Sequence, residues 1–333
     1  MKKLIGILMI AGLISCKTIN SNNKMNKIEL TPELSKIVDN LQKIHVFDGK
    51  NPLDISRKGY ETMAVQLGGK KEMVRMIEEF EISQKNHKIP VRIYRPNGNE
   101  SKSPAIVYLH GGWFVSGSFE THDAIVRQLA NATGAAIVFV DYRLAPEYPF
   151  PAGFDDAQSA TEWIIANADY LNFDKNKIGI IGDSAGGALA VGVSTQLARQ
   201  LRFQVLIYPA TDNKLNTKTW EVYENGPIIN KEEGIRAWNW YLSSPKDLQN
   251  PLAVPSLIKD FKNTPPTLVV LAEHDPLRDE GQQLAENMKA SGVQVKILDY
   301  KEMVHGFMHM GAVLKETGEA VQQIAAFTKE NSK

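Results

Sequence analysis

The stretch KIGIIGDSAGG, residues 177–187, decides the fold. Its first five residues form a mostly apolar, β-branched run that predicts a buried strand, and the small residues that follow predict a helix. Ser184 lies between the two, and the glycines around it allow a strand and a helix to approach closely. A strand, a sharp turn that carries a serine and a helix together form the context of a nucleophile elbow. A glycine-rich turn whose serine caps the helix is the alternative interpretation.

Apolar strands and helical segments alternate on both sides of this stretch. The pattern predicts strands at 87–94, 105–109, 136–140, 177–181, 204–208, 267–271 and 293–298, and helices at 122–132, 154–168, 185–200, 278–290 and 313–327. Such alternation indicates an α/β fold with a mostly parallel sheet and helices on both faces. Prolines and the stretch WNWYL (238–242) interrupt it between 209 and 266. We expect this insertion to lie above the carboxyl ends of the strands, where such sheets bind ligands.

The beginning of the chain predicts export. A basic start and an apolar run over 4–14, too short to span a bilayer, predict a signal peptide at residues 1–15. The run ends in LISC, which resembles the lipobox of bacterial lipoprotein precursors. That resemblance implies cleavage before Cys16, acylation of this cysteine and attachment to a membrane, facing the periplasm or the cell surface. A plain signal peptide or a buried helix with an incidental cysteine is the alternative.

The segments that follow the cysteine differ in character. Residues 16–27 are rich in Asn, Ser and Lys and predict a polar tether. Residues 28–85 show apolar positions at helical spacing, and we expect N-terminal helices that form part of a cap.

Composition narrows the function classes. The chain has 333 residues, of which 43% are hydrophobic and 23% charged, as in ordinary globular proteins. Lys plus Arg and Asp plus Glu each number 38, so the formal net charge is zero and no basic face for nucleic acid is indicated. Cys16 is the single cysteine, which excludes a disulfide within the chain.

A catalytic serine needs an acid that orients its base, and Asp275 is the favoured acid. It directly follows the apolar strand predicted at 267–271, where a parallel sheet presents catalytic side chains. Asp279 is a rival, but it falls in the first turn of the next predicted helix, where a carboxylate is favourable for another reason. Glu273 is a second rival, closer to the strand end.

The favoured base is His305, which lies in the loop after the last predicted strand. Its chain order after Ser184 and Asp275 is the one that serine hydrolases with a nucleophile elbow use. His309 is a rival only four residues further on, and His274 is adjacent to the acid. The remaining candidates lie away from strand ends: His45, His87 and His122.

Oxyanion donors are expected from two places: the residue after the nucleophile, and the loop after an early strand. The first is Ala185. The second is the loop HGGW (110–113), whose backbone N–H groups at Gly111, Gly112 or Trp113 can turn inward. His110 is expected to orient this loop rather than to act as a base.

Taken together, these motifs resemble the hormone-sensitive-lipase-like esterases of the α/β-hydrolase fold, also called bacterial family IV. The resemblance covers about residues 85–330 in the family's order: HGG (110–112), DYRLAPE (141–147), PFPA (149–152), GDSAGG (182–187), DPLRDEG (275–281) and HGF (305–307). It implies a triad of Ser184, Asp275 and His305 in a catalytic domain spanning 86–330. It also implies a helical cap that combines the N-terminal helices with the 209–266 insertion, and a structural role for 141–147.

The resemblance further implies a carboxylesterase that hydrolyses short-chain acyl esters through an acyl-enzyme, without a metal or an organic cofactor. The expected partners are a small-molecule ester and, through Cys16, a membrane; a homodimer is also compatible with the sequence. An acetyl ester of a carbohydrate or an amide is an alternative substrate for the same triad. A ligand-binding protein on a hydrolase scaffold is the alternative outside enzymes.

One position departs from the family pattern. Trp113 stands where the family usually has a third glycine, if Phe114 and Val115 align with the aromatic residue and valine that follow it. Its backbone N–H is retained, so the oxyanion hole is not abolished. We expect the indole to narrow the acyl pocket or to crowd the alcohol side.

Overall fold

Eight strands form one sheet among the residues that the computed structural model describes, which are 30–44, 51–98 and 102–333. They are β1 (Met76–Ser83), β2 (Lys88–Arg95), β3 (Ser103–Leu109), β4 (Ala136–Val140), β5 (Phe173–Asp183), β6 (Gln204–Ile207), β7 (Thr267–His274) and β8 (Val295–Val304). The order across the sheet is β1-β2-β4-β3-β5-β6-β7-β8. The pairs β1–β2 and β2–β4 are antiparallel, and the other five pairs are parallel. The predicted mostly parallel sheet is confirmed.

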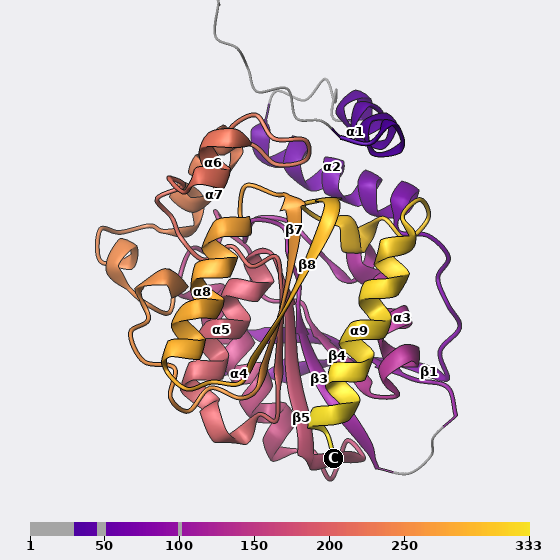
Figure 1. Ribbon diagram of the computed structural model, residues 1–333. Helices are drawn as coiled ribbons and strands as arrows, with labels where there is room; N and C mark the ends of the chain where they lie inside the picture. The colour runs from indigo at the N-terminus through magenta and orange to yellow at the C-terminus, as the bar shows by residue number, and fades with distance from the viewer. Residues whose placement is uncertain (1–29, 45–50, 99–101) are drawn as a thin grey trace, which may run out of the picture.

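Helices cover both faces of this sheet, as Figure 1 shows. One face carries α3 (Phe119–Thr133) and α9 (Lys315–Asn331), and the other carries α4 (Ala152–Ala166), α5 (Ala185–Leu197) and α8 (Arg278–Ala290). Because both faces are covered, the central strands are buried throughout; β4 and β6 have no exposed position. This explains why their sequences are continuous apolar runs rather than alternating ones.

Four further helices lie above the carboxyl ends of the parallel strands (Figure 1). We call them the cap helices: α1 (Pro32–Ile44), α2 (Pro52–Leu67), α6 (Lys218–Val222) and α7 (Lys231–Tyr241). Side-chain hydrogen bonds cap the N-termini of two of these helices. Asn51 accepts a hydrogen bond from the N–H of Leu53 at the start of α2, and Asn230 forms a capping box with Glu233 at the start of α7. The α6 and α7 helices both come from the 209–266 insertion.

Two expectations about the chain before β3 and after β7 need correction. Residues 28–85 are not helical throughout, because α2 ends at Leu67 and residues 76–83 form the edge strand β1. The glutamates of β1 suit an exposed helix, but pairing with β2 along the full strand overrides that local preference. The last strand also continues to Val304, six residues beyond its predicted end. His305 therefore follows it directly.

The predicted signal peptide (1–15), Cys16 and tether (16–27) lie outside the described residues, as does His45. Among the described helices, none combines the length and the apolar character needed to cross a bilayer.

Candidate active site

Ser184 occupies a strained turn between β5 and α5. Its backbone has φ 52° and ψ −119°, a region that non-glycine residues rarely adopt. The turn is closely packed: a Cβ on Gly186, two residues after the serine, would lie 2.0 Å from the carbonyl oxygen of Leu109. This packing keeps Ser184 in its strained conformation. The N–H of Ser184 also donates to the carbonyl of Ile207 on the neighbouring strand (2.8 Å). The stretch thus forms the predicted elbow, and the serine is not a side-chain cap of the helix.

His305 joins the serine to the acid. Its Nε2 lies 3.1 Å from Ser184 Oγ, and its Nδ1 lies 2.8 Å from Asp275 Oδ2. Asp275 is fully buried, and its second oxygen, Oδ1, accepts the N–H of Leu277 at 2.8 Å. Three residues that follow the ends of β5, β7 and β8 are therefore hydrogen-bonded in series. This is the arrangement in which a base can accept the serine proton while an acid fixes its tautomer.

The rival acids have other partners. The carboxylate of Asp279 accepts the N–H of Thr219 (3.0 Å), and that of Glu273 accepts the N–H of Glu302 (3.0 Å). Neither is hydrogen-bonded to His305, whose acidic partner is Asp275.

The rival histidines also contact polar groups other than the catalytic serine. His309 Nε2 lies 3.2 Å from Asp183 Oδ2, and His122 Nε2 lies 3.2 Å from Asp183 Oδ1. His274 faces the hydroxyl of Tyr223, and His87 lies 2.6 Å from the carboxylate of Asp156.

The loop after β3 provides the expected oxyanion donors, with one correction. The N–H of Gly111 donates to Asp183 Oδ1 (3.0 Å), so it is not available to a substrate. The N–H groups of Gly112, Trp113 and Ala185 have no acceptor within the described part of the chain. Gly112 and Trp113 line the same cavity as Ser184, and Ala185 begins helix α5. These three N–H groups remain as the candidate oxyanion donors.

The cap helices hold this loop in an unusual conformation. Trp113 and Phe114 have positive φ angles of 56° and 64°, which cost free energy for residues with side chains. The Phe114 ring stacks on Tyr241 of α7 at 3.8 Å, and the Trp113 ring lies 6.4 Å from that of Trp220 of α6. Arg57 of α2 donates to the carbonyl of Val115 (2.8 Å). Contacts from three cap helices thus stabilise the strained loop.

His110 orients the loop, as predicted. The Nδ1 atom of its buried ring lies 2.8 Å from the carbonyl oxygen of Gly111, and the ring stacks on that of Tyr142 with the centroids 4.2 Å apart. Burial lowers the pKa of His110 to about 3, so the ring is neutral at ordinary pH and its Nδ1–H donates to that carbonyl. The hydroxyl of Tyr142, in the segment 141–147, donates to the carbonyl of His110 (2.6 Å). This segment supports the loop from below.

A buried polar cluster under the elbow was not predicted. Besides Gly111 and the two histidines, Asp183 accepts the hydroxyl of Tyr108 (2.9 Å). Burial alone would raise the pKa of Asp183, but the charge interaction and hydrogen bonds of His122 and His309 outweigh burial and hold this pKa well below its ordinary value. The cluster joins β3, α3, β5 and the loop after β8. In the sequence, only the adjacency of Asp183 to Ser184 points toward it.

Within the described residues, this cluster is also the one buried group whose donor atoms could hold a metal ion. The ligand atoms of His122, Asp183 and His309 lie within 4.8 Å of one another. Hydrogen bonds already account for these contacts, because Asp183 accepts from both rings and from Tyr108 and Gly111. We assign the cluster a structural role.

The cavity over Ser184 has mostly apolar walls from α2 and the 209–266 insertion. Its lining includes Ile55, Met63, Ile228, Ala237 and Trp240. Apolar walls with a few converging polar groups are typical of small-ligand sites. With the hydrogen-bonded series beneath it, this cavity defines the class: a serine hydrolase whose triad lies at the carboxyl edge of a parallel sheet.

Comparisons with known proteins agree with this class. Residues 106–309 match the family model of the alpha/beta hydrolase fold. The chain is 33% identical over 279 residues to the ethyl acetate hydrolase of Pseudomonas putida, covering 81% of this chain and 88% of the relative. It is 38% identical over 241 residues to carboxylesterase NlhH of Mycobacterium tuberculosis, covering 70% and 75%. An esterase structure from Pyrobaculum calidifontis superimposes with a TM-score of 0.83 at 38% identity, covering 91% of this chain and 99% of the other.

The chain therefore belongs to the α/β-hydrolase fold family, in the hormone-sensitive-lipase-like group that its motifs resemble.

Proposed function

We propose that this chain is a serine carboxylic ester hydrolase that cleaves short-chain acyl esters through an acyl-enzyme. The observation that carries the proposal is the hydrogen-bonded series from Ser184 through His305 to Asp275, set in a mostly apolar cavity. Relatives named ethyl acetate hydrolase and carboxylesterase support the ester substrate and the short acyl chain.

The geometry suggests how each group acts. Ser184 Oγ attacks the ester carbonyl carbon while His305 Nε2, 3.1 Å away, takes its proton. The negative charge on the carbonyl oxygen is stabilised by the N–H groups of Gly112, Trp113 and Ala185, each worth about 2.7–4 kcal/mol of barrier height. The carbon–oxygen bond to the alcohol then breaks, and His305 donates its proton to the leaving alcohol. A water molecule, deprotonated by His305, hydrolyses the acyl-enzyme in the same way and regenerates the serine.

A panel of p-nitrophenyl esters of increasing acyl length tests the proposal. We expect hydrolysis with a preference for short chains, and loss of turnover in Ser184→Ala. Ser194→Ala is the matched control, because Ser194 is fully buried on α5, the helix that follows Ser184, and its hydroxyl has no partner among the described residues. Turnover retained in Ser184→Ala would contradict the mechanism. Faster hydrolysis of acetylated sugars or amides than of simple esters would instead favour those substrate classes.

We also propose that the chain is an exported lipoprotein anchored to a membrane through Cys16. The support comes from the sequence alone: a basic start, an apolar run and a single cysteine at its end. Two or more acyl chains would anchor it stably, since one chain binds only marginally. In a bacterial host fed an alkyne fatty acid, the wild type should be labelled and found in membranes. A Cys16→Ser variant with equal labelling would contradict the proposal.

A further inference from the structure

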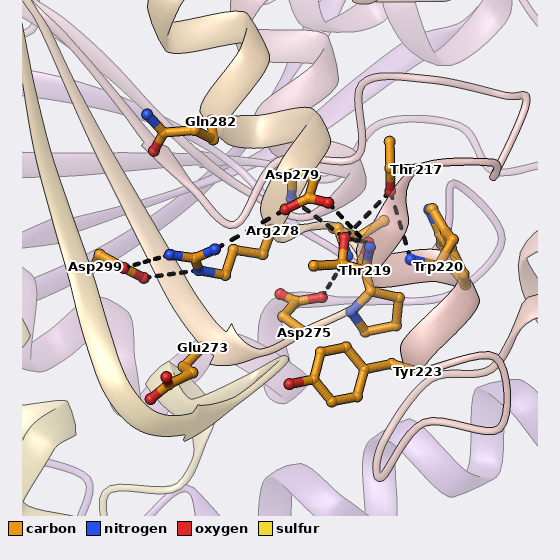
Figure 2. A network of polar contacts seen from close by, with 12 residues as sticks. Thr217, Thr219, Trp220, Tyr223, Glu273, Asp275, Arg278, Asp279, Gln282 and Asp299 are labelled. Atoms are coloured by element: carbon orange, nitrogen blue, oxygen red, sulfur yellow. Dashed lines mark hydrogen bonds and ion pairs between the residues drawn. The ribbon is translucent and has the colours of Figure 1, made fainter. Parts of the chain in front are cut away.

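Cap helix α6 is hydrogen-bonded to the loop that carries Asp275. Figure 2 shows Thr219, on α6, next to Asp279 at the start of α8. The N–H of Thr219 donates to Asp279 Oδ2 (3.0 Å), and the N–H of Asp279 donates to Thr219 Oγ1 (3.3 Å). The hydroxyl of Thr219 in turn donates to the carbonyl oxygen of Pro276 at 2.7 Å. Thr219 is only 8% exposed, so water competes little with these bonds.

The carbonyl that Thr219 holds belongs to the peptide that orients the acid. A peptide unit is planar, so the C=O of Pro276 and the N–H of Leu277 turn together. That N–H donates to Asp275 Oδ1 at 2.8 Å, and the other oxygen of Asp275 accepts Nδ1–H of His305. The hydrogen bonds therefore run without interruption from the Thr219 hydroxyl, through one peptide, to the carboxylate and the imidazole. A carbonyl that accepts a hydrogen bond also polarises its own peptide and strengthens the N–H on the other side.

The same short helix touches the second half of the catalytic machinery. Trp220, the next residue on α6, is fully buried, and its ring lies 6.4 Å from the ring of Trp113. Trp113 belongs to the loop that supplies oxyanion donors. One helix thus contacts the acid loop through Thr219 and the oxyanion loop through Trp220.

We propose that Thr219 is a positioning residue: its hydroxyl fixes the Pro276–Leu277 peptide and thereby aims the Asp275 carboxylate at His305. The inference rests on the proposed hydrolase function and extends it to a residue of the cap. Thr219 is not among the residues that line the cavity over Ser184, so it acts on the reaction through Asp275 and not through the substrate.

Thr219→Val removes the hydroxyl and keeps the shape of the side chain. The Pro276 carbonyl then loses its donor, and the peptide that holds Asp275 can rotate. We expect kcat for p-nitrophenyl acetate to fall by about 10- to 100-fold, the range that small misplacements of catalytic groups produce, with KM nearly unchanged. We also expect the acidic limb of the pH profile of kcat/KM to move to lower pH, because Asp275 then stabilises protonated His305 less well.

Two variants separate positioning from a structural contribution. Thr219→Ser restores the hydroxyl and should recover most of kcat and the wild-type pH profile. Thr161→Val is the matched control, since the buried Thr161 hydroxyl also donates to a backbone carbonyl, that of Ala157 (2.7 Å), on α4. It should lower the melting temperature but leave kcat and the pH profile unchanged.

The outcomes are distinct. The inference is overturned if Thr219→Val matches Thr161→Val in kcat and pH profile, or if Thr219→Ser fails to recover activity. If Thr219→Val does not fold, Thr219→Ala removes the same hydroxyl and is judged by the same criteria. An inactive wild-type protein would overturn the proposed hydrolase function itself, whereas an active wild type with an unaffected Thr219→Val overturns only the positioning role.

Discussion

Replacing Asp275 by asparagine should invert the proton arrangement of the triad. The N–H of Leu277 donates to Asp275 Oδ1, so the amide oxygen of the new asparagine side chain must occupy that side, because two donors cannot face each other. The amide NH₂ then takes the place of Oδ2, which lies 2.8 Å from His305 Nδ1. His305 can accept this hydrogen bond only with Nδ1 unprotonated. Its proton then sits on Nε2, which points at Ser184 Oγ and can no longer accept the serine proton.

The size of this effect follows from the tautomer. Loss of the correct tautomer in an otherwise intact triad lowers kcat by a factor on the order of 10⁴. The barrier therefore rises by about 5 kcal/mol. The side chains are nearly isosteric, so the fold should be retained. The assay is steady-state hydrolysis of p-nitrophenyl acetate at neutral pH, with circular dichroism to check folding.

Glu273→Gln is the matched control for Asp275→Asn. Glu273 lies at the end of the same strand, but its carboxylate accepts the N–H of Glu302 and does not contact His305. Its kcat should stay within a few fold of the wild type. A loss of less than tenfold in Asp275→Asn, or an equal loss in Glu273→Gln, would refute the reasoning about the acid.

Three further predictions concern the loop, the elbow and the buried cluster. Trp113→Gly should broaden the range of acyl lengths in a p-nitrophenyl ester panel, and an unchanged chain-length profile would count against it. Loss of the indole, which is 9% exposed, lowers the free energy of unfolding by about 3–5 kcal/mol, and relief of the positive φ of 56° offsets about 1–3 kcal/mol of that loss. Gly186→Ala should not fold, because its Cβ would lie 2.0 Å from the carbonyl oxygen of Leu109. The control is Gly318→Ala in α9, where a Cβ would meet nothing within 4 Å and should raise the free energy of unfolding by about 0.5–1 kcal/mol. A soluble, active Gly186→Ala variant would be inconsistent with the close packing of the elbow. Folding lowers the pKa of Asp183, so the ionised carboxylate contributes to stability above its ordinary pKa of 3.8, and this contribution is lost as the pH falls below 3.8. Chemical denaturation between acidic and neutral pH should show this loss of stability in the wild type and a flatter pH dependence in Asp183→Asn. The same pH dependence in both proteins would contradict the prediction.

The sequence was sufficient for the elbow and the triad for a physical reason. Buried parallel strands are continuous apolar runs, so the ends of β5 and β7 can be located, and Ser184 and Asp275 each follow one. His305 follows β8, a partly exposed strand whose end lies six residues beyond the predicted one, so its place after the last strand was predicted but not its distance from the strand end. A sheet brings the carboxyl ends of its parallel strands to one edge, so these positions in the sequence predict that the three side chains lie close together.

The features that were predicted wrongly or missed depend on contacts between residues far apart in the sequence, which the pattern of apolar strands does not encode. The edge strand β1 carries glutamates and exposed positions, and only its pairing with β2 makes it a strand. The glycine-rich loop predicts a substrate-facing N–H at Gly111, but Asp183 is 72 residues away in sequence and takes that hydrogen bond. The contact of Thr219 with the acid loop likewise joins the cap to a distant strand end.

The most direct test of the catalytic assignment is covalent labelling with a fluorophosphonate, followed by mass spectrometry of the digested protein. We expect one adduct per chain, on Ser184, and no adduct in either Ser184→Ala or His305→Ala, because the serine is activated by the base 3.1 Å away. Labelling at another residue, or undiminished labelling of His305→Ala, would contradict it.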